Sequence, residues 1–267
     1  MHPVLVVLPI GEGFALHVYG LMGALGFLAA MTFVLREAQR AGLDQEKIVN
    51  LCLGALLAGV VGSRLLFVAL NWDIFSGDLA SILNLRDGGL VFLGGVVLAM
   101  CFSAVYTHRA GISVWRAGDV ILPGLALGHA FGRIGCLSAG CCYGRATTLP
   151  WGIQFDPTSV GPTDLGQHYH PVQVYESSTD IALFLLLVYV LRHKRFDGQV
   201  FLLYFGLYTI LRFAHEFLRG DVLERGYFLP EVLGPVLSTS QGISLLLVVP
   251  AILLYRWRRA QAPLRPA

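Results

Sequence analysis

The stretch IVNLCLGALLAGVVGSRLLFVAL, residues 48–70, is an almost unbroken apolar run. A helix needs about 20 predominantly apolar residues to cross a bilayer, so this run is long enough. Its only charged residue is Arg64. A guanidinium cannot shed its proton, and placing one at membrane depth costs at least about 2.5 kcal/mol. The run therefore predicts a membrane-spanning helix with an anionic group near Arg64.

The composition of the whole chain agrees with a membrane protein. Of its 267 residues, 55% are apolar and only 13% are charged, with a mean hydropathy of +0.67. Soluble proteins carry about 25% charged residues. The net charge of +2 is too small to indicate nucleic acid as a partner. The chain is predicted to be an all-α, polytopic integral membrane protein.

Further apolar runs predict about seven membrane-spanning helices in a single membrane domain, residues 1–267. The first thirteen residues lack a basic segment, so no cleavable signal peptide is expected. The predicted spans lie near residues 14–35, 48–70, 88–107, 119–136, 174–191, 200–218 and 240–256, and an outer loop covers residues 137–173.

The lysines and arginines outside these spans are unevenly distributed. With seven crossings, twelve of them fall on one side of the membrane and four on the other. Cytoplasmic loops are enriched in these residues. This bias predicts an N-terminus outside the cell and a C-terminus in the cytoplasm.

This orientation brings polar side chains of five spans to the outer leaflet. Arg133 and Arg212 lie towards the outer ends of the fourth and sixth predicted spans, and Arg64 lies in the outer third of the second. Each arginine alone is compatible with snorkelling, in which a long stem carries the charge to the interface. Together they favour a polar cavity. Because a guanidinium pairs with two phosphate oxygens at once, we expect a phospholipid head group there.

Helical spacing groups more polar side chains with these arginines. His129 lies four residues before Arg133 and so shares its helix face. Tyr208, Arg212 and Glu216 form a second ladder at the same spacing, in which Glu216 is expected to hold Arg212 in position.

The order of these motifs resembles the bacterial prolipoprotein diacylglyceryl transferase family. The resemblance covers most of the chain. Its segments are residues 15–22, 62–65, 87–90 with Gly94 and Gly95, 132–135 with Gly140 and Gly144, 170–176, and Tyr208, Arg212, Glu216, Phe217 and Arg219.

The resemblance implies an enzyme of the bacterial cytoplasmic membrane that moves the sn-1,2-diacylglyceryl group of phosphatidylglycerol to a thiol. The acceptor would be the lipobox cysteine of an exported preprolipoprotein, and glycerol 1-phosphate would leave. Arg133 and Arg212 would hold the phosphate and Tyr208 would orient it. No metal or organic cofactor is implied. The expected substrate-binding residues are Arg64, His17, Tyr19, Gly89, Gly94, Gly95, Gly144 and Glu216.

The chain departs from the family pattern at Leu93, Cys136 and Cys141, where the family usually has histidine, asparagine and glutamate. Leucine cannot accept a proton. Either His129 accepts the proton of the acceptor thiol, or nearby arginines lower the pKa of that thiol enough without a base. His129 also fits a purely structural role within the helix bundle.

Three cysteines, Cys136, Cys141 and Cys142, end the fourth span and open the outer loop. They are compatible with a nucleophile, a redox pair, a metal site, a disulfide from Cys136 to one of the others, or packing among glycines. Their spacing is not a recognised zinc pattern. The predicted catalytic residues are Arg133, Arg212, Tyr208, His129, Cys136 and Cys141.

Two other functions stay open at this level. One is a diverged transferase with another acceptor or a cysteine-based mechanism. The other is a non-catalytic membrane protein that binds phospholipid or senses redox state. The partners expected for the favoured function are phosphatidylglycerol, exported preprolipoproteins and membrane lipid, without nucleic acid.

Overall fold

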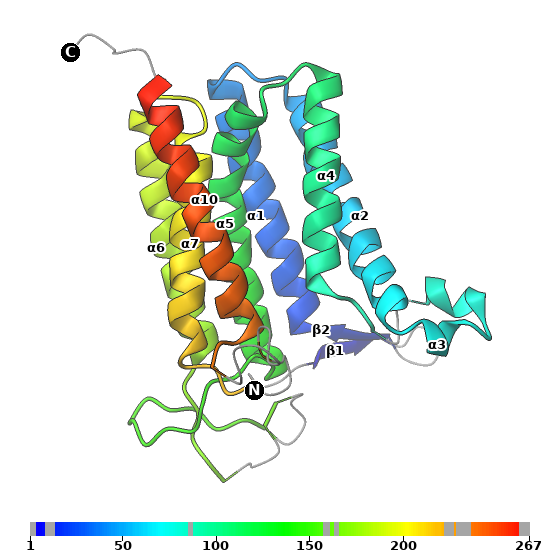
Figure 1. The fold of residues 1–267 in the computed structure, drawn as a ribbon. Coiled ribbons are helices and arrows are strands. Elements are labelled where there is room, and N and C mark those ends of the chain that lie inside the picture. The colour runs from blue at the N-terminus through cyan, green and yellow to red at the C-terminus, as the bar shows by residue number, and fades with distance from the viewer. Residues whose placement is uncertain are drawn as a thin grey trace. The chain divides into compact units, whose positions relative to one another are not determined.

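The computed structural model describes residues 4–8, 14–84, 88–156, 161–162, 166–221, 227 and 236–261. These residues are mainly helical and include one short β-hairpin (Figure 1). The helices are α1 (Val18–Arg40), α2 (Gln45–Leu70), α3 (Trp72–Phe75), a 3-10 helix (Leu79–Leu83), α4 (Phe92–Ala110), α5 (Val114–Ala139), α6 (Val172–His193), α7 (Gln199–Glu216) and α10 (Thr239–Gln261).

Six of these helices, α1, α2, α4, α5, α6 and α10, are long and apolar enough to cross a membrane. Many of their large apolar side chains face outwards, including Leu57 at 66% exposure and Leu246 at 61%, as expected for surfaces that contact lipid. The prediction of an all-α, polytopic membrane protein is confirmed. The seventh crossing, which α7 would supply, and the orientation of the termini stay predictions.

Two predicted span boundaries are wrong, and a hairpin was missed. Residues Val4–Leu8 (β1) pair antiparallel with Phe14–His17 (β2), so the first span begins four residues later than predicted, at the start of α1. The third span was predicted to begin at residue 88. Gly88 and Gly89 instead have φ angles of +78° and +79°, which no right-handed helix accommodates, and α4 begins at Phe92.

The chain divides into two compact units. One is Leu35–Ala117, and the other combines Met1–Val34 with Gly118–Ala267. The prediction of one membrane domain over the whole chain stays a prediction.

In the unit Leu35–Ala117, α2 and α4 cross at glycines. A Cβ atom added to Gly94 would lie 2.3 Å from the carbonyl oxygen of Gly62, and one added to Gly95 would lie 2.7 Å from that of Gly59. Small residues of this kind let membrane helices approach closely. The predicted substrate-binding glycines Gly94 and Gly95 therefore have a packing role that requires glycine.

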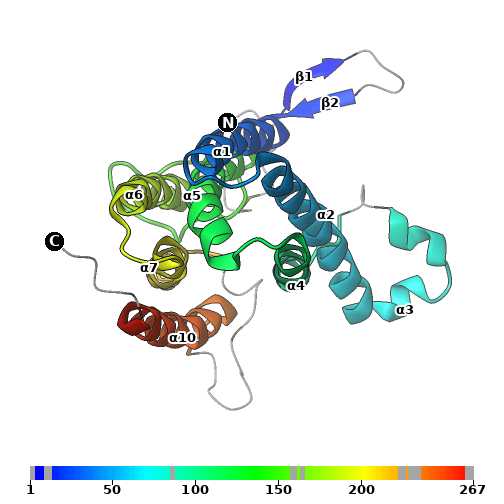
Figure 2. The same cartoon turned by 90° about the horizontal axis from the view of Figure 1, so that it is seen from above.

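In the other unit, α5, α6 and α7 enclose an apolar core (Figure 2). The fully buried Asp119 of α5 accepts hydrogen bonds from the backbone N–H groups of Gly198 and Phe201, both at 2.9 Å, and from Nζ of Lys194 at 2.8 Å. An anion at the N-terminus of α7 satisfies unpaired amides and complements the helix dipole. The core residues are Leu122, Ala126, Leu183, Leu187, Val200 and Tyr204.

Candidate active site

A polar pocket lies between α5, α6 and α7, and its cavity volume is about 10 Å³, which is room for about one water molecule. Because its side chains recur at helical spacing, three and four residues apart, each helix presents them on one face. The pocket brings together Arg133, Arg212, His129 and Tyr208, which were predicted to lie in one site. Its lining is His129 and Arg133 from α5, Glu176 and Asp180 from α6, and Tyr208, Leu211, Arg212 and His215 from α7.

Glu176 is the common partner of three arginines. Its carboxylate lies 2.9 Å from Nε of Arg133, 3.5 Å from a terminal nitrogen of Arg212 and 3.4 Å from one of Arg219. The side chain is only 3% exposed. A buried charge must be paired, and here one carboxylate joins guanidinium groups that come from α5, from α7 and from the segment after α7.

Arg212 and Arg219 each have a second carboxylate. Arg212 pairs with Glu216 at 2.9 Å, as its spacing predicted, and donates to the hydroxyl of Ser240 at 3.0 Å. Arg219 binds Asp221 through two nitrogens, at 2.9 Å and 2.5 Å. Burial lowers the pKa of Arg219, but the hydrogen bonds and charge of Asp221 outweigh it, so the pKa lies above its usual value.

His129 lies beside a carboxylate and an aromatic ring. Its Nδ1 atom is 2.8 Å from Asp180, and its ring is 5.6 Å from the ring of Tyr208, edge to face. The carboxylate favours a proton on Nδ1, which leaves Nε2 as the nitrogen able to accept one. This arrangement fits a proton acceptor, and the Nδ1–Asp180 pair, like the Arg133–Glu176 pair, is close but not aligned as a hydrogen bond.

The pocket and the ion pairs that adjoin it contain four carboxylates and three guanidinium groups, so an incoming phosphate must compete with carboxylates. Two features make this possible. Among the described residues, neither terminal amino group of Arg133 has a hydrogen-bond acceptor, and the pairs Arg133–Glu176 and Arg212–Glu176 are not aligned as hydrogen bonds. The free edge of Arg133 is the edge that pairs with two phosphate oxygens. The charged groups counted are Arg133, Arg212, Arg219, Glu176, Asp180, Glu216 and Asp221.

Arg64 has a different environment in its own unit. All five of its N–H donors face backbone carbonyl oxygens at 2.8–3.1 Å. The guanidinium also lies over the rings of Phe67 and Phe75. These contacts organise the segment between α2 and α4, so a role in substrate binding stays a prediction. The carbonyl oxygens belong to Ser81, Ile82, Asn84, Gly88 and Gly89.

The other predicted substrate-binding residues do not line the pocket. His17 is exposed, and Tyr19 is 53% exposed at the start of α1. Gly89 packs against Arg64 and Phe67. Asp87, part of the same motif in the family resemblance, lies outside the described residues.

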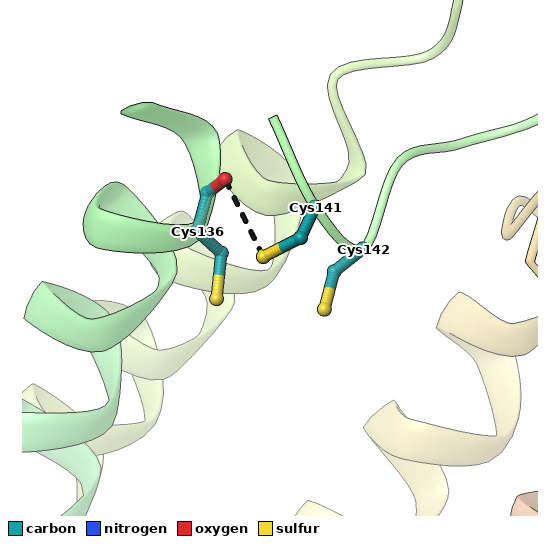
Figure 3. Close-up of side chains that lie close together, drawn as sticks. All are labelled: Cys136, Cys141 and Cys142. Atoms are coloured by element: carbon teal, nitrogen blue, oxygen red, sulfur yellow. Dashed lines mark hydrogen bonds between the residues drawn. The ribbon is translucent and has the colours of Figure 1, made fainter. Parts of the chain in front are cut away.

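The three outer cysteines form a compact thiol cluster (Figure 3). The sulfur atoms of Cys136, Cys141 and Cys142 all lie within 4.8 Å of one another, and the three residues are free and half-buried. Cys136 comes from the last turns of α5, and the other two from the loop that follows. Hydrogen bonds from the thiols of Cys136 and Cys141 lower the pKa of the Cys142 thiol, and the Arg219 guanidinium lowers it further.

The loop that carries the thiol cluster is fastened to the segment after α7. The backbone N–H of Arg145 donates to the carbonyl of Leu218 at 2.8 Å, and that of Gly220 donates to the carbonyl of Tyr143 at 3.1 Å. A Cβ atom on Gly144 would lie 2.5 Å from the carbonyl oxygen of His170. The predicted role of Gly144 in substrate binding is untested, whereas its close packing positions this loop.

Sequence reasoning missed three residues that organise the site, namely Glu176, Asp180 and Arg219. Glu176 and Arg219 belong to motifs of the family resemblance, but neither was among the predicted site residues. Asp180 follows Glu176 by one helical turn, and this spacing was a signal that both carboxylates share one face of α6. The spacing gives no hint that Arg219, beyond α7, turns back to the same carboxylate.

The fold and the pocket define a multi-pass membrane protein with a polar pocket, lined by arginines and carboxylates, inside a helix bundle. A model of the family "Prolipoprotein diacylglyceryl transferase" matches residues 5–257. The chain belongs to this family.

Relatives from distant bacteria support the assignment. The chain is 33% identical to the phosphatidylglycerol–prolipoprotein diacylglyceryl transferase of Clostridioides difficile over 88% of both chains. It is 33% identical to that of Clostridium tetani over 96% of this chain and 97% of the relative. The corresponding protein of Thermosynechococcus vestitus is 31% identical over 86% of this chain and 84% of the relative.

Proposed function

We propose that the protein is a phosphatidylglycerol–prolipoprotein diacylglyceryl transferase of the bacterial cytoplasmic membrane. It transfers the sn-1,2-diacylglyceryl group to the lipobox cysteine of exported preprolipoproteins. The observation that carries the proposal is that Arg133 and Arg212 meet in one buried pocket around Glu176. Family membership supplies the reaction, and the pocket supplies groups suited to its phosphate.

The electrophile is the glyceryl carbon that bears the phosphate ester. The acceptor sulfur forms a bond to this carbon, the carbon–oxygen bond breaks, and the oxygen leaves with its electron pair as glycerol phosphate. Negative charge grows on the leaving phosphate, so the free edge of Arg133 and the guanidinium of Arg212 stabilise the transition state more than the bound lipid. Tyr208 lines the same pocket and orients the phosphate.

The thiol proton needs an acceptor, and Leu93 cannot be one. We assign this role to His129, because Asp180 beside Nδ1 leaves Nε2 able to take up the proton. A positioned base of this kind contributes about 10²–10⁴-fold to the rate.

The test uses cells depleted of their own transferase and follows the lipidation of a model prolipoprotein. The wild-type chain should restore lipidation. Arg133→Ala should lower it by about 10²–10³-fold, the usual cost of losing one donor to a developing charge. Arg116→Ala is the matched control, since Arg116 lies at the other end of α5 and binds the carbonyl of Ala41.

Two results would contradict the proposal. One is a wild-type chain that reaches the membrane and lipidates no prolipoprotein. The other is full activity of Arg133→Ala, which would exclude the phosphate assignment and leave the family membership intact.

A further inference from the structure

The thiol cluster is held in a defined geometry by its surroundings. Cys142 has a φ of +61°, and it is the one non-glycine residue with positive φ in the described part of the chain. A left-handed conformation is unfavourable for a residue with a side chain. The amide of Gln173, which is fully buried, donates to the carbonyl of Cys141 at 2.8 Å. Backbone strain held in place by a buried hydrogen bond is typical of ligand-binding sites.

The spacing of the three sulfur atoms is close to that of a metal site. Sulfur atoms bound to a tetrahedral zinc ion at about 2.3 Å lie about 3.8 Å apart. The sulfurs here lie within 4.8 Å of one another, so small side-chain rotations bring them to that distance. Among the described residues, no histidine, aspartate or glutamate joins this group as a fourth ligand. Three protein ligands and an open position are the pattern of catalytic zinc sites, whereas structural sites are closed by four.

We infer that Cys136, Cys141 and Cys142 hold a Zn²⁺ ion whose open fourth position binds the acceptor thiol of the protein substrate. The inference rests on the proposed function, because only that function supplies a thiol substrate. It departs from the sequence-based expectation, in which no metal is implied and the cysteine spacing matches no recognised zinc pattern.

The charges around the cluster suit such an ion. Three thiolates and one Zn²⁺ carry a single net negative charge, and the guanidinium of Arg219, which also pairs with Asp221 and Glu176, lies beside Cys142. Arg219 also contacts Glu176, the carboxylate shared with Arg133 and Arg212. A thiol bound at the cluster is therefore next to the residues assigned to the phosphate.

The zinc ion supplies an activated nucleophile. A thiol that coordinates zinc is deprotonated outright, and here its proton passes to His129. The zinc-bound sulfur then forms the bond to the glyceryl carbon while the carbon–oxygen bond breaks and glycerol phosphate leaves with the electron pair. The product is a neutral thioether, a weak ligand that dissociates from the metal. Nothing is oxidised or reduced in this step.

The first test is the metal content of the full chain purified in detergent without chelators. We expect one zinc ion per chain, and Cys136→Ser, Cys141→Ser and Cys142→Ser should each lower zinc occupancy at least tenfold. The double variant Cys52→Ser/Cys101→Ser is the matched control and should keep its zinc. A zinc-free wild-type chain that is active, or one with a disulfide among the three cysteines, would overturn the inference.

The second test examines the open position. Co²⁺ replaces zinc in the purified chain, and its visible absorption reports the number of thiolate ligands. A lipobox peptide should shift these bands, and the same peptide with serine in place of cysteine should not. Equal spectra with both peptides would exclude thiol binding at the metal. Specific binding of Cu⁺ in place of Zn²⁺ would also exclude it, since three thiolates complete the coordination of that ion.

Transferase assays separate this inference from the proposed function. Removing zinc should lower lipidation at least tenfold, and adding Zn²⁺ back should restore it. An active chain whose rate does not depend on zinc would overturn the inference while the proposed function stands. A chain that binds zinc and the peptide thiol but transfers no diacylglyceryl group would overturn the proposed function and leave the metal site standing.

Discussion

Two buried carboxylates, those of Glu176 and Asp180, pair with the basic side chains of the pocket. Glu176 pairs with three guanidinium groups in a region where charge is costly, and Asp180 lies 2.8 Å from Nδ1 of one histidine. Removing one partner of a buried pair leaves the others unpaired and typically costs about 3–5 kcal/mol. Substitution of Glu176 is therefore expected to change stability, whereas substitution of His129, the partner of Asp180, is expected to change the rate.

Glu176→Gln is expected to lower the thermal midpoint of the purified protein by several degrees, because Arg133, Arg212 and Arg219 lose a shared negative charge. Thermal unfolding in detergent measures the effect. Glu46→Gln is the control, since Glu46 is exposed in the first turn of α2 and should leave the midpoint unchanged. Equal midpoints for both variants would show that Glu176 does not hold the arginines together.

His129→Gln is expected to lower the rate of diacylglyceryl transfer by about 10²-fold without changing the thermal midpoint. The reason is that glutamine fills similar space and cannot accept a proton from a thiol. His193→Gln, at the exposed end of α6, is the matched control. Full activity of His129→Gln would assign the histidine to packing alone.

At the scale of elements, close helix contacts depend on residues with no side chain. Gly94→Leu is expected to destabilise the crossing of α2 and α4, because even a Cβ atom would lie 2.3 Å from the backbone of Gly62. Gly23→Ala is the control, as a Cβ at Gly23 meets nothing within 4 Å. Protease resistance of the folded protein in membranes distinguishes the two, and comparable resistance would contradict the packing role.

The ion pair between Lys194 and Asp119 should give the stability a dependence on alkaline pH. Partial burial lowers the pKa of Lys194, but the hydrogen bond and charge of Asp119 outweigh it, so the pKa lies above the usual value of 10.5. A raised pKa means that the stabilisation is complete below about pH 10 and is lost as pH rises through the folded-state pKa. Lys194→Met should remove this alkaline decline in thermal midpoint. The same decline in Lys194→Met would assign it to other groups.

The sequence predicted elements better than the contacts between distant segments. Hydropathy located six spans because bilayer thickness imposes a minimum length. The β-hairpin before α1 was missed because its strands are short and lie beside a long apolar run. Helical spacing joined Arg133 to His129 and Arg212 to Glu216. Three arginines meet at Glu176, and hydrogen bonds fasten the loop that carries the thiol cluster to the segment after α7. Both sets of contacts join residues far apart in sequence, and residue spacing carries no information on such contacts.

At the scale of the whole molecule, the charge bias predicts an N-terminus outside and a C-terminus in the cytoplasm. An alkaline phosphatase fused to the C-terminus should be inactive, since that enzyme needs an oxidising exterior, and a fluorescent protein at the same place should be bright. Fusions within the outer loop at residue 148 are expected to give the reverse pattern. A phosphatase active both at residue 148 and at the C-terminus would indicate an even number of crossings between them, with α7 failing to span, and activity at the C-terminus alone would indicate the reverse orientation.

The carboxylate that joins three arginines also bears on turnover. An empty pocket of bare cations would retain any stray anion, including the phosphate released by the reaction. Here Glu176 already pairs with Nε of Arg133 and with a terminal nitrogen of Arg212, so it competes with the released phosphate for these two arginines. Glu176 would therefore weaken binding of the lipid head group and speed release of glycerol phosphate, which frees the site for the next turnover.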